Sequence, residues 1–244
     1  MRILDNQQLI YISKPRCGST SLRKILDQYS GQAPLYCWDV ANEHPIFHPH
    51  ITAPALLNYL ADTSPDRLAY KLFTVIRDPL KMLYSYFKFF KPDINMRFNF
   101  EDNYCPDQCC DFVAWLRVGC VPSSPLWLPH GPRSIDVSNF SPLSIEAHAL
   151  NESSSCLIHH IFQIENPSSI TAFLARSLRL SELPKLISIN HSENITLEDV
   201  IPDCDQGDDI LDRLVKSFPF ESHLYGYTHK RPVYFDEVAE KICQ

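Results

Sequence analysis

The stretch YISKPRCGSTSLRKIL, residues 11–26, contains the change of hydrophobic period that decides the fold. The apolar run at 8–13 that leads into it is too short for a helix and predicts a buried strand. From Ser19 onward the apolar residues recur at the spacing i, i+3, i+4 and i+7, which predicts an amphipathic helix closed by Gly31. The apolar positions with this spacing are Leu22, Ile25, Leu26 and Tyr29.

A strand, a tight polar turn and a helix in this order predict an anion-binding site. The first turn of a helix presents backbone N–H groups without intrahelical partners, and the helix dipole adds partial positive charge. Gly18 allows the backbone to approach an anion, and Arg16 supplies a charged fork that fits phosphate or sulfate. The serine and threonine residues at 19–21 could also be ordinary helix caps. The GxxxxGK[ST] spacing of a nucleotide triphosphatase is absent.

The rest of the chain alternates apolar strands with amphipathic helices. Such alternation indicates one α/β domain, residues 1–244, with a mainly parallel central sheet covered on both faces. The expected strands are 70–78, 158–166 and 185–190, and the expected helices are 53–62, 79–91, 168–180 and 208–218. Residues 92–143 read as loops with short helices.

A second polar cluster follows the strand at 70–78. Arg77 lies where that strand ends, which is where open α/β sheets place ligand contacts. Asp78 and Pro79 form a helix start, and Ser85 lies two helical turns further on. Arg77 and Ser85 could hold a second phosphate, although Arg77 could equally pair with Asp78. Lys81 and Lys88, on the face of Ser85, could be solvated side chains.

Together, PRCGSTSL (15–22) and VIRDPLKMLYSYF (75–87) resemble the two cofactor motifs of sulfotransferases that use 3′-phosphoadenosine-5′-phosphosulfate (PAPS), most closely the uronyl 2-O-sulfotransferases of the carbohydrate branch. The segments FQIEN (162–166), INHSEN (189–194) and ESHLYGY (221–227) are weaker likenesses. The resemblance implies a P-loop-like three-layer sandwich, and PAPS as co-substrate. The residues that it implies for PAPS binding are Lys14, Arg16, Cys17, Gly18, Ser19, Thr20, Ser21, Arg77 and Ser85.

The resemblance also implies a catalytic base and a cation beside the leaving group. HPIFHPHITAPAL (44–56) is similar to a family segment in which a histidine takes the proton of the acceptor hydroxyl, and this maps to His50 with His48 beside the acceptor. A glutamate, another histidine or a metal-binding role for these histidines are the alternatives. Arg16 stands where the family has lysine, with Lys14 as a possible substitute, and Met82 stands where the family often has arginine.

Composition narrows the class of partner. The chain has a net charge of −7 and no basic stripe of the kind that a nucleic-acid-binding protein needs. No apolar stretch predicts membrane insertion. Nine cysteines without disulfide spacing predict a cytoplasmic chain with free thiols. CPDQCC (105–110) and Cys120 do not complete a zinc pattern, so no metal is expected.

We therefore expect an enzyme that transfers a sulfuryl group from PAPS to a hydroxyl-bearing acceptor. A carbohydrate is the acceptor class that the resemblance favours. Two alternatives remain open. One is a catalytically silent nucleotide-binding or scaffold protein with the same fold. The other is a small-molecule kinase, which the missing GK[ST] disfavours.

Overall fold

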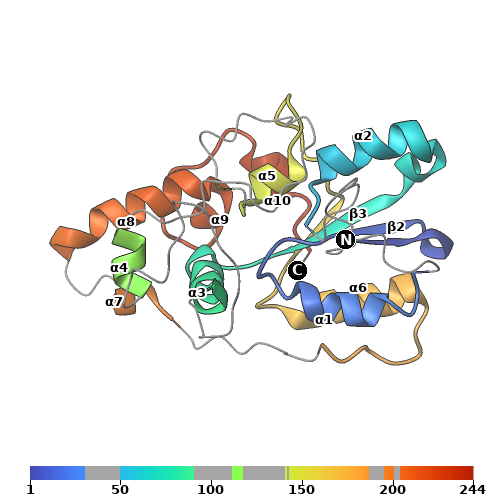
Figure 1. Cartoon of the computed structure of the whole chain (residues 1–244), viewed down its shortest axis with the longest axis horizontal. Helices are drawn as coiled ribbons and strands as arrows, with labels where there is room; N and C mark the ends of the chain where they lie inside the picture. Colours follow the sequence, from blue (N-terminus) through green and yellow to red (C-terminus); the bar gives the residue numbers. More distant parts are fainter. Residues whose placement is uncertain are drawn as a thin grey trace.

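The computed structural model shows a mixed α/β protein with a four-stranded, mostly parallel, open sheet (Figure 1). It describes residues 1–30, 50–90, 112–117, 141, 143–186, 195–200 and 204–243. The strands in these ranges are β1 (Arg2–Leu4), β2 (Leu9–Ile12), β3 (Lys71–Ile76) and β4 (His160–Gln163). The α-helices there are α1 (Ser19–Leu26), α2 (Ala53–Thr63), α3 (Pro79–Phe90), α4 (Phe112–Arg117), α5 (Ile145–Ala149), α6 (Pro167–Leu178), α7 (Leu197–Val200), α8 (Cys204–Ser217), α9 (Pro219–Leu224) and α10 (Phe235–Ala239). The 3₁₀-helices there are η1 (Asp5–Gln7) and η2 (Pro65–Ala69).

The strands are hydrogen-bonded in the order β1-β2-β3-β4. β2, β3 and β4 run parallel, while β1 pairs antiparallel with β2 through the short η1 turn. Ile12 lies opposite Thr74, and Ile76 lies opposite Gln163. The carboxyl ends of the three parallel strands therefore meet at one edge of the sheet.

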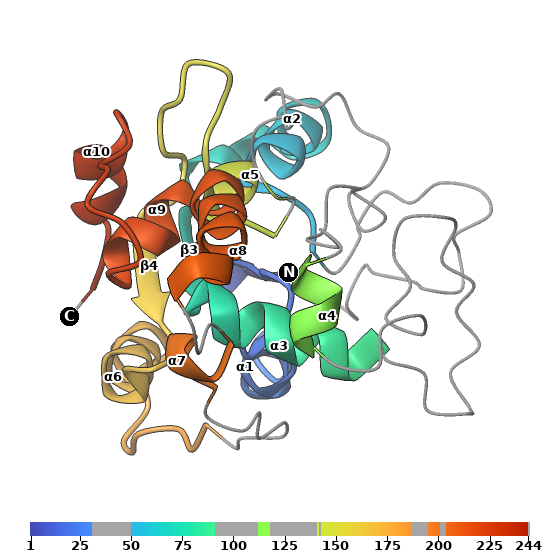
Figure 2. The same ribbon diagram turned by 90° about the vertical axis from the view of Figure 1, so that its left-hand side faces the viewer.

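Side chains that alternate along the strands divide the core into two layers. Tyr11, Phe73, Val75 and Phe162 belong to the layer that includes α1, α3 and α6. Ile10, Ile12, Leu72, Ile76 and Ile161 belong to the layer that includes α2 and α5. Figures 1 and 2 show α1 and α6 on one side of the sheet and α2 and α5 on the other. A strand buried on both faces needs apolar residues at nearly every position, as β2 and β3 have.

Most of the elements predicted from periodicity are confirmed, with shorter bounds. β2, β3 and β4 lie inside the predicted strands, and α2, α3, α6 and α8 overlap the predicted helices. α1 ends at Leu26, earlier than the spacing to Tyr29 predicted, while Gly31 lies outside the described residues. Lys185 and Leu186 do not belong to a strand, which contradicts the start of the strand predicted at 185–190. The rest of that stretch lies outside the described residues.

None of the helices in the described ranges is both long enough and apolar enough to cross a membrane.

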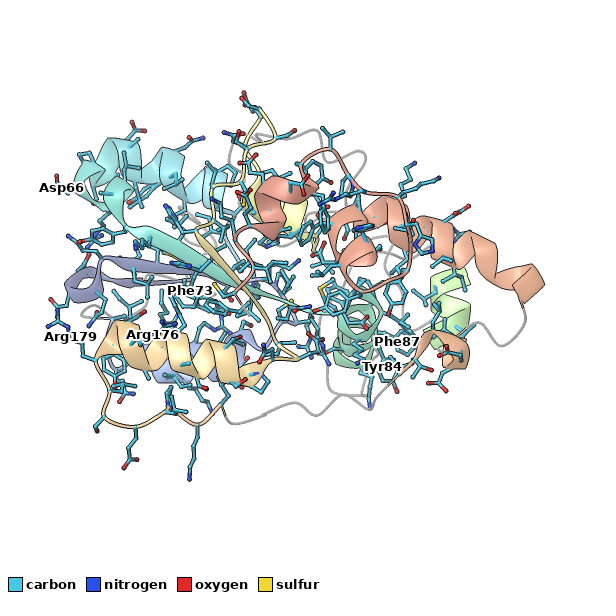
Figure 3. The ribbon with its side chains drawn as sticks, turned by 180° about the vertical axis from the view of Figure 1, so that it is seen from behind. Asp66, Phe73, Tyr84, Phe87, Arg176 and Arg179 are labelled. Atoms are coloured by element: carbon cyan, nitrogen blue, oxygen red, sulfur yellow. The ribbon has the colours of Figure 1, made fainter. Side chains whose placement is uncertain are left out.

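The aromatic side chains at the centre of the sheet are expected to contribute strongly to the stability of the fold. The Phe73 ring contacts Tyr11, Phe162 and Phe173, with centroid distances of 5.0, 6.3 and 5.2 Å, and it is fully buried (Figure 3). We expect Phe73→Ala to lower the free energy of unfolding by about 3 to 5 kcal/mol in urea denaturation, because the truncation leaves a cavity. Leu183→Ala, at a position 62% exposed, is the control and should change it by less than about 0.5 kcal/mol. Equal losses for the two variants would contradict this packing.

Candidate functional site

The loop that follows β2 and the end of β3 meet at the carboxyl edge of the sheet. The Thr74 hydroxyl donates to the carbonyl oxygen of Ile12 at 2.7 Å, which fixes the last paired position of β2. Beyond it the chain turns sharply, with Arg16 at φ 58° and Gly18 at φ 71°. A left-handed backbone conformation is unfavourable for arginine unless neighbouring contacts stabilise it, so this turn is a strained segment.

The Arg16 guanidinium crosses from the loop to α3. Its Nε and Nη2 donate to the Ser85 hydroxyl oxygen at 3.1 and 2.9 Å. Arg77 Nη1 donates to the carbonyl oxygen of Arg16 at 3.3 Å. The structure therefore brings together three residues that the two sequence motifs predicted as one site.

Two positive charges lie close together in this cluster. Burial and then the neighbouring Arg77 charge lower the pKa of Arg16 to about 10. Arg16 nevertheless remains a cation at neutral pH. A bound anion would stabilise both guanidinium groups, because its negative charge offsets the cost of their burial and their mutual repulsion.

The first turn of α1 adds hydroxyl and backbone donors to the same loop. Gly18 is the N-cap, Ser19 is buried, Ser21 is half-buried and Thr20 is exposed. The loop also contains Cys17, whose buried thiol lies 3.8 Å from the sulfur of Met82. Burial raises the pKa of the Cys17 thiol to about 12, so the thiol stays protonated where it packs against Met82.

Acidic and phenolic side chains fix the neighbouring strand ends. The Asp78 carboxylate accepts from the backbone N–H of Leu80 at 2.9 Å, which confirms the predicted cap of α3. Tyr227 donates to the same oxygen at 2.8 Å. Glu165, just after β4, accepts from the Asp78 N–H at 3.2 Å and from Tyr225 at 2.8 Å.

Sequence reasoning did not assign Glu165, Tyr225 and Tyr227 to the site. Their segments, FQIEN and ESHLYGY, were noted only as likenesses. These tyrosines meet the carboxylates of Glu165 and Asp78 only in the folded chain, because 60 and 149 positions separate the bonded pairs. Burial and then the neighbouring carboxylates raise the pKa of both tyrosines, so each hydroxyl remains a donor.

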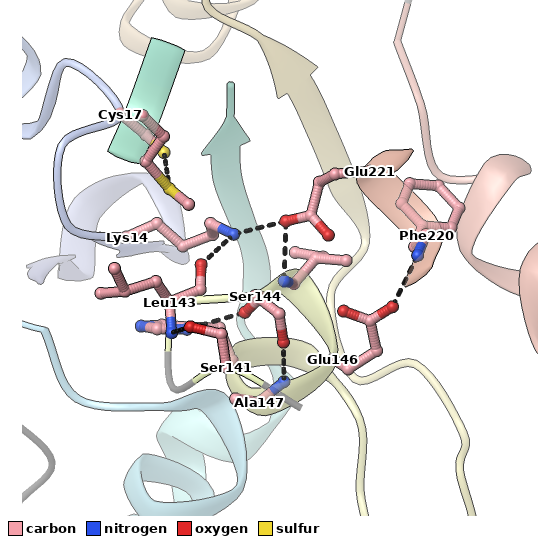
Figure 4. Close-up of polar contacts among 12 residues, drawn as sticks. Lys14, Cys17, Ser141, Leu143, Ser144, Glu146, Ala147, Phe220 and Glu221 are labelled. Carbon is pink, nitrogen blue, oxygen red and sulfur yellow. Dashed lines mark hydrogen bonds and ion pairs between the residues drawn. The ribbon is translucent and has the colours of Figure 1, made fainter. Parts of the chain in front are cut away.

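Lys14 points into the interior rather than toward the Arg16 cluster. Its ammonium donates to the carbonyl oxygen of Leu143 and to a carboxylate oxygen of Glu221, both at 2.6 Å (Figure 4). The side chains of Lys14 and Glu221 are both 0% exposed. Lys14 therefore supports the loop from behind, and its predicted role as a direct phosphate ligand has no counterpart in these contacts.

His50 lies against the residue that opens the loop. Its Nδ1 is 2.7 Å from the carbonyl oxygen of Ser13. Because a carbonyl oxygen can only accept, Nδ1 carries the hydrogen, and the lone pair of the neutral ring is on Nε2. This tautomer is the one that can accept a proton at Nε2. His48, predicted beside it, lies outside the described residues.

Among the described side chains, no group of three or more His, Cys, Asp or Glu residues could hold a metal ion. The CPDQCC segment and Cys120 lie outside the described residues.

Comparisons of the chain with protein-family models, curated proteins and solved structures find no match. Function is therefore inferred from the residues and their geometry.

The backbone at Gly18 leaves little room for a side chain, so a substitution there is expected to destabilise the fold. A Cβ atom at Gly18 would lie 2.7 Å from Cδ1 of Ile164, whereas one at Gly226, at φ 81°, would meet nothing within 4 Å. Gly226→Ala should cost about 1 to 2 kcal/mol of unfolding free energy from backbone strain alone. Gly18→Ala should cost more.

A double-mutant cycle isolates that contact. Ile164→Val removes Cδ1, so it should be less destabilising in the Gly18→Ala background than in the natural chain. Equal effects of Ile164→Val in both backgrounds, measured by thermal unfolding, would contradict the close approach.

Proposed function

We propose that the chain transfers a sulfuryl group from PAPS to an acceptor hydroxyl. The observation that carries the proposal is the meeting of Arg16, Arg77 and Ser85 where β2 and β3 end, next to the start of α1. A nucleotide with phosphates at both the 3′ and the 5′ positions of its ribose suits such a site, because cationic and hydroxyl donors come from two separate motifs. The helices on both faces of the sheet agree with the P-loop-like three-layer sandwich that the resemblance implies (Figure 2).

The two motifs divide the ligand between them. The loop from Arg16 to Ser21 would hold the 5′-phosphosulfate, with backbone N–H groups and the α1 dipole supporting the negative charge. Arg77 and Ser85 would hold the 3′-phosphate. Ser85 accepts both bonds from Arg16, so its own O–H remains available to donate to a phosphate oxygen.

The transfer step follows from these positions. His50 Nε2 takes the proton of the acceptor hydroxyl, and the oxygen attacks sulfur in line while the bond from sulfur to the 5′-phosphate oxygen breaks. The bisphosphate nucleotide leaves with that bond's electron pair, and Arg16 stabilises the new charge. A carbohydrate is the acceptor class that the resemblance favours.

Ligand binding tests the proposed cluster first. In calorimetry with adenosine 3′,5′-bisphosphate, Arg16→Ala and Arg77→Ala should each weaken binding at least about tenfold, because each removes a charge-assisted contact. Arg179→Ala, at an exposed position at the far end of the sheet, is the matched control (Figure 3). Replacement of the bisphosphate by ATP should give weaker binding to the natural chain. No binding of the bisphosphate, or equal binding by all four proteins, would contradict the proposal.

The base is tested separately from binding. His50→Ala should lower the transfer rate from sulfur-35-labelled PAPS to a hydroxyl acceptor by about 100-fold or more, because general-base catalysis is lost. Its affinity for the bisphosphate should stay within about twofold of the natural chain, since His50 contacts no phosphate in this scheme. His229→Ala, at an exposed histidine, is the control. Full activity of His50→Ala would assign the proton transfer to another group.

A further inference from the structure

A buried cluster behind the anion-binding loop joins α5 to α9. The Glu221 carboxylate accepts from the backbone N–H of Ile145, the first residue of α5, at 2.8 Å. In return, the Glu146 carboxylate accepts from the N–H of Phe220, in the first turn of α9, at 2.8 Å. Each glutamate thus caps the other helix, as Figure 4 shows. We call Lys14, Glu146 and Glu221 the buried clasp.

The clasp also reaches two other parts of the chain. Lys14 Nζ bridges Glu221 and the carbonyl oxygen of Leu143, and Lys14 lies only two residues before Arg16. Tyr234, at the start of α10, donates from its hydroxyl to the Glu146 carboxylate over 2.9 Å. Lys14, Glu146 and Glu221 are all fully buried.

Two carboxylate oxygens of the clasp lack a donor. In the part of the chain that the structure describes, neither Glu146 Oε2 nor Glu221 Oε2 has a hydrogen-bond partner, although both atoms are buried. Buried acceptors left in this way are costly. A proton on one of the two carboxyl groups would remove one of the two buried negative charges.

Charge balance favours the same arrangement. With one shared proton, the clasp contains one ammonium and one carboxylate, so it is neutral. With no proton it carries an uncompensated negative charge in the interior, which is strongly unfavourable. Burial and then the Glu221 charge raise the pKa of Glu146 to about 7.

Other ionisable groups border the clasp. Tyr234 faces Glu146 from the start of α10, His148 lies on α5 itself, and Cys17 lies near Lys14 and Glu221. Burial and then Glu146 raise the pKa of Tyr234, and burial raises that of Cys17, so both stay neutral around pH 7. His148 bonds through Nδ1 to the carbonyl oxygen of Ser144 at 3.0 Å.

We propose that Lys14 and Glu221 are positioning residues of the anion-binding loop, and that they hold it in place while Glu146 and Glu221 share a single proton. Loss of that proton makes the two carboxylates repel each other and separates α5 from α9. Lys14, which bonds to Leu143 on one side and to Glu221 on the other, then loses one of its two contacts. The loop from Arg16 to Ser21 is released, so the inference rests on the proposed function of that loop.

The direction of the pH effect follows from linkage. The folded chain keeps a proton that a free carboxyl loses near its usual pKa of 4.5. Its stabilising effect is complete below that value and disappears as the pH rises through about 7. If the bound form requires the proton, bisphosphate affinity should fall about tenfold between pH 6 and pH 8.

Glu146→Gln is the matched variant, because an amide imitates the protonated carboxyl. Its oxygen can accept from Phe220 and Tyr234, and its NH₂ group can donate to Glu221. We expect the ratio of bisphosphate dissociation constants, natural chain over Glu146→Gln, to rise about tenfold between pH 6 and pH 8. The ratio cancels ionisation of the ligand. A constant ratio would overturn the proton-sharing part of the proposal.

Hydrogen exchange tests the clasp without any ligand. Protection factors of amides 16–22 in the natural chain should fall above pH 7, while those of α6, which lies on the face of the sheet opposite α5, should not. Unchanged protection of the loop would overturn the proposal even if the bisphosphate binds. Absence of bisphosphate binding at every pH, with the exchange change present, would contradict only the proposed function.

The positioning role itself is tested by removing both charges. Lys14→Met/Glu221→Gln should stay folded, since both charges of the buried ion pair are removed together and the glutamine oxygen can still accept from the Ile145 N–H. Its bisphosphate affinity at pH 6 should nevertheless fall about tenfold, because misplacement of binding groups is costly. Natural affinity in this folded variant would overturn the assignment of Lys14 and Glu221 as positioning residues.

Discussion

Parallel pairing of β2 with β3 is the constraint on which the site depends. The register that sets Ile12 opposite Thr74 makes both strands end at the same edge of the sheet. The loop after β2 and Arg77 after β3 are then neighbours, although about sixty residues of chain separate them. A shift of this register by one residue would turn every apolar side chain of β2 to the other face of the sheet. The two core layers therefore stabilise the position of the site as well as the fold.

The strained loop is held from two directions. In front, the Arg16 guanidinium is bonded to Ser85 on α3, and Arg77 is bonded to the Arg16 carbonyl. Behind, Lys14 is anchored to α9 and to the segment that precedes α5. Successive charged residues of one loop thus have opposite tasks. Lys14 supports the backbone from the interior, whereas Arg16 reaches Ser85 in the cluster that we propose as the anion site.

The sequence predicted the parts of this arrangement that local pattern controls. The change of period after Ser19, the cap at Asp78 and the strand before Arg77 are each written within a few neighbouring residues, and all three are confirmed. β1 escaped prediction because three residues carry too little periodicity, and it is stabilised by pairing with β2. The start of the strand predicted at 185–190 was wrong, since Lys185 and Leu186 lie outside any strand.

The supporting half of the site depends on contacts between distant residues. The position of Lys14 beside the loop predicts a phosphate ligand. Only the fold shows that Lys14 forms an ion pair with Glu221, 207 positions away. Tyr227 and Asp78 are separated by 149 positions. No local signal gives such pairs. The tautomer of His50 likewise depends on the carbonyl of Ser13, which periodicity does not reveal.

A crystal structure of the chain with adenosine 3′,5′-bisphosphate is the most direct test of the account. We expect the 5′-phosphate to lie on the loop from Arg16 to Ser21, against the first turn of α1, and the 3′-phosphate to lie against Arg77 and Ser85. Lys14 should remain bonded to Glu221 in that complex. A bisphosphate bound elsewhere, or with neither phosphate in contact with Arg16 or Arg77, would contradict the assignment of this edge of the sheet as a PAPS site.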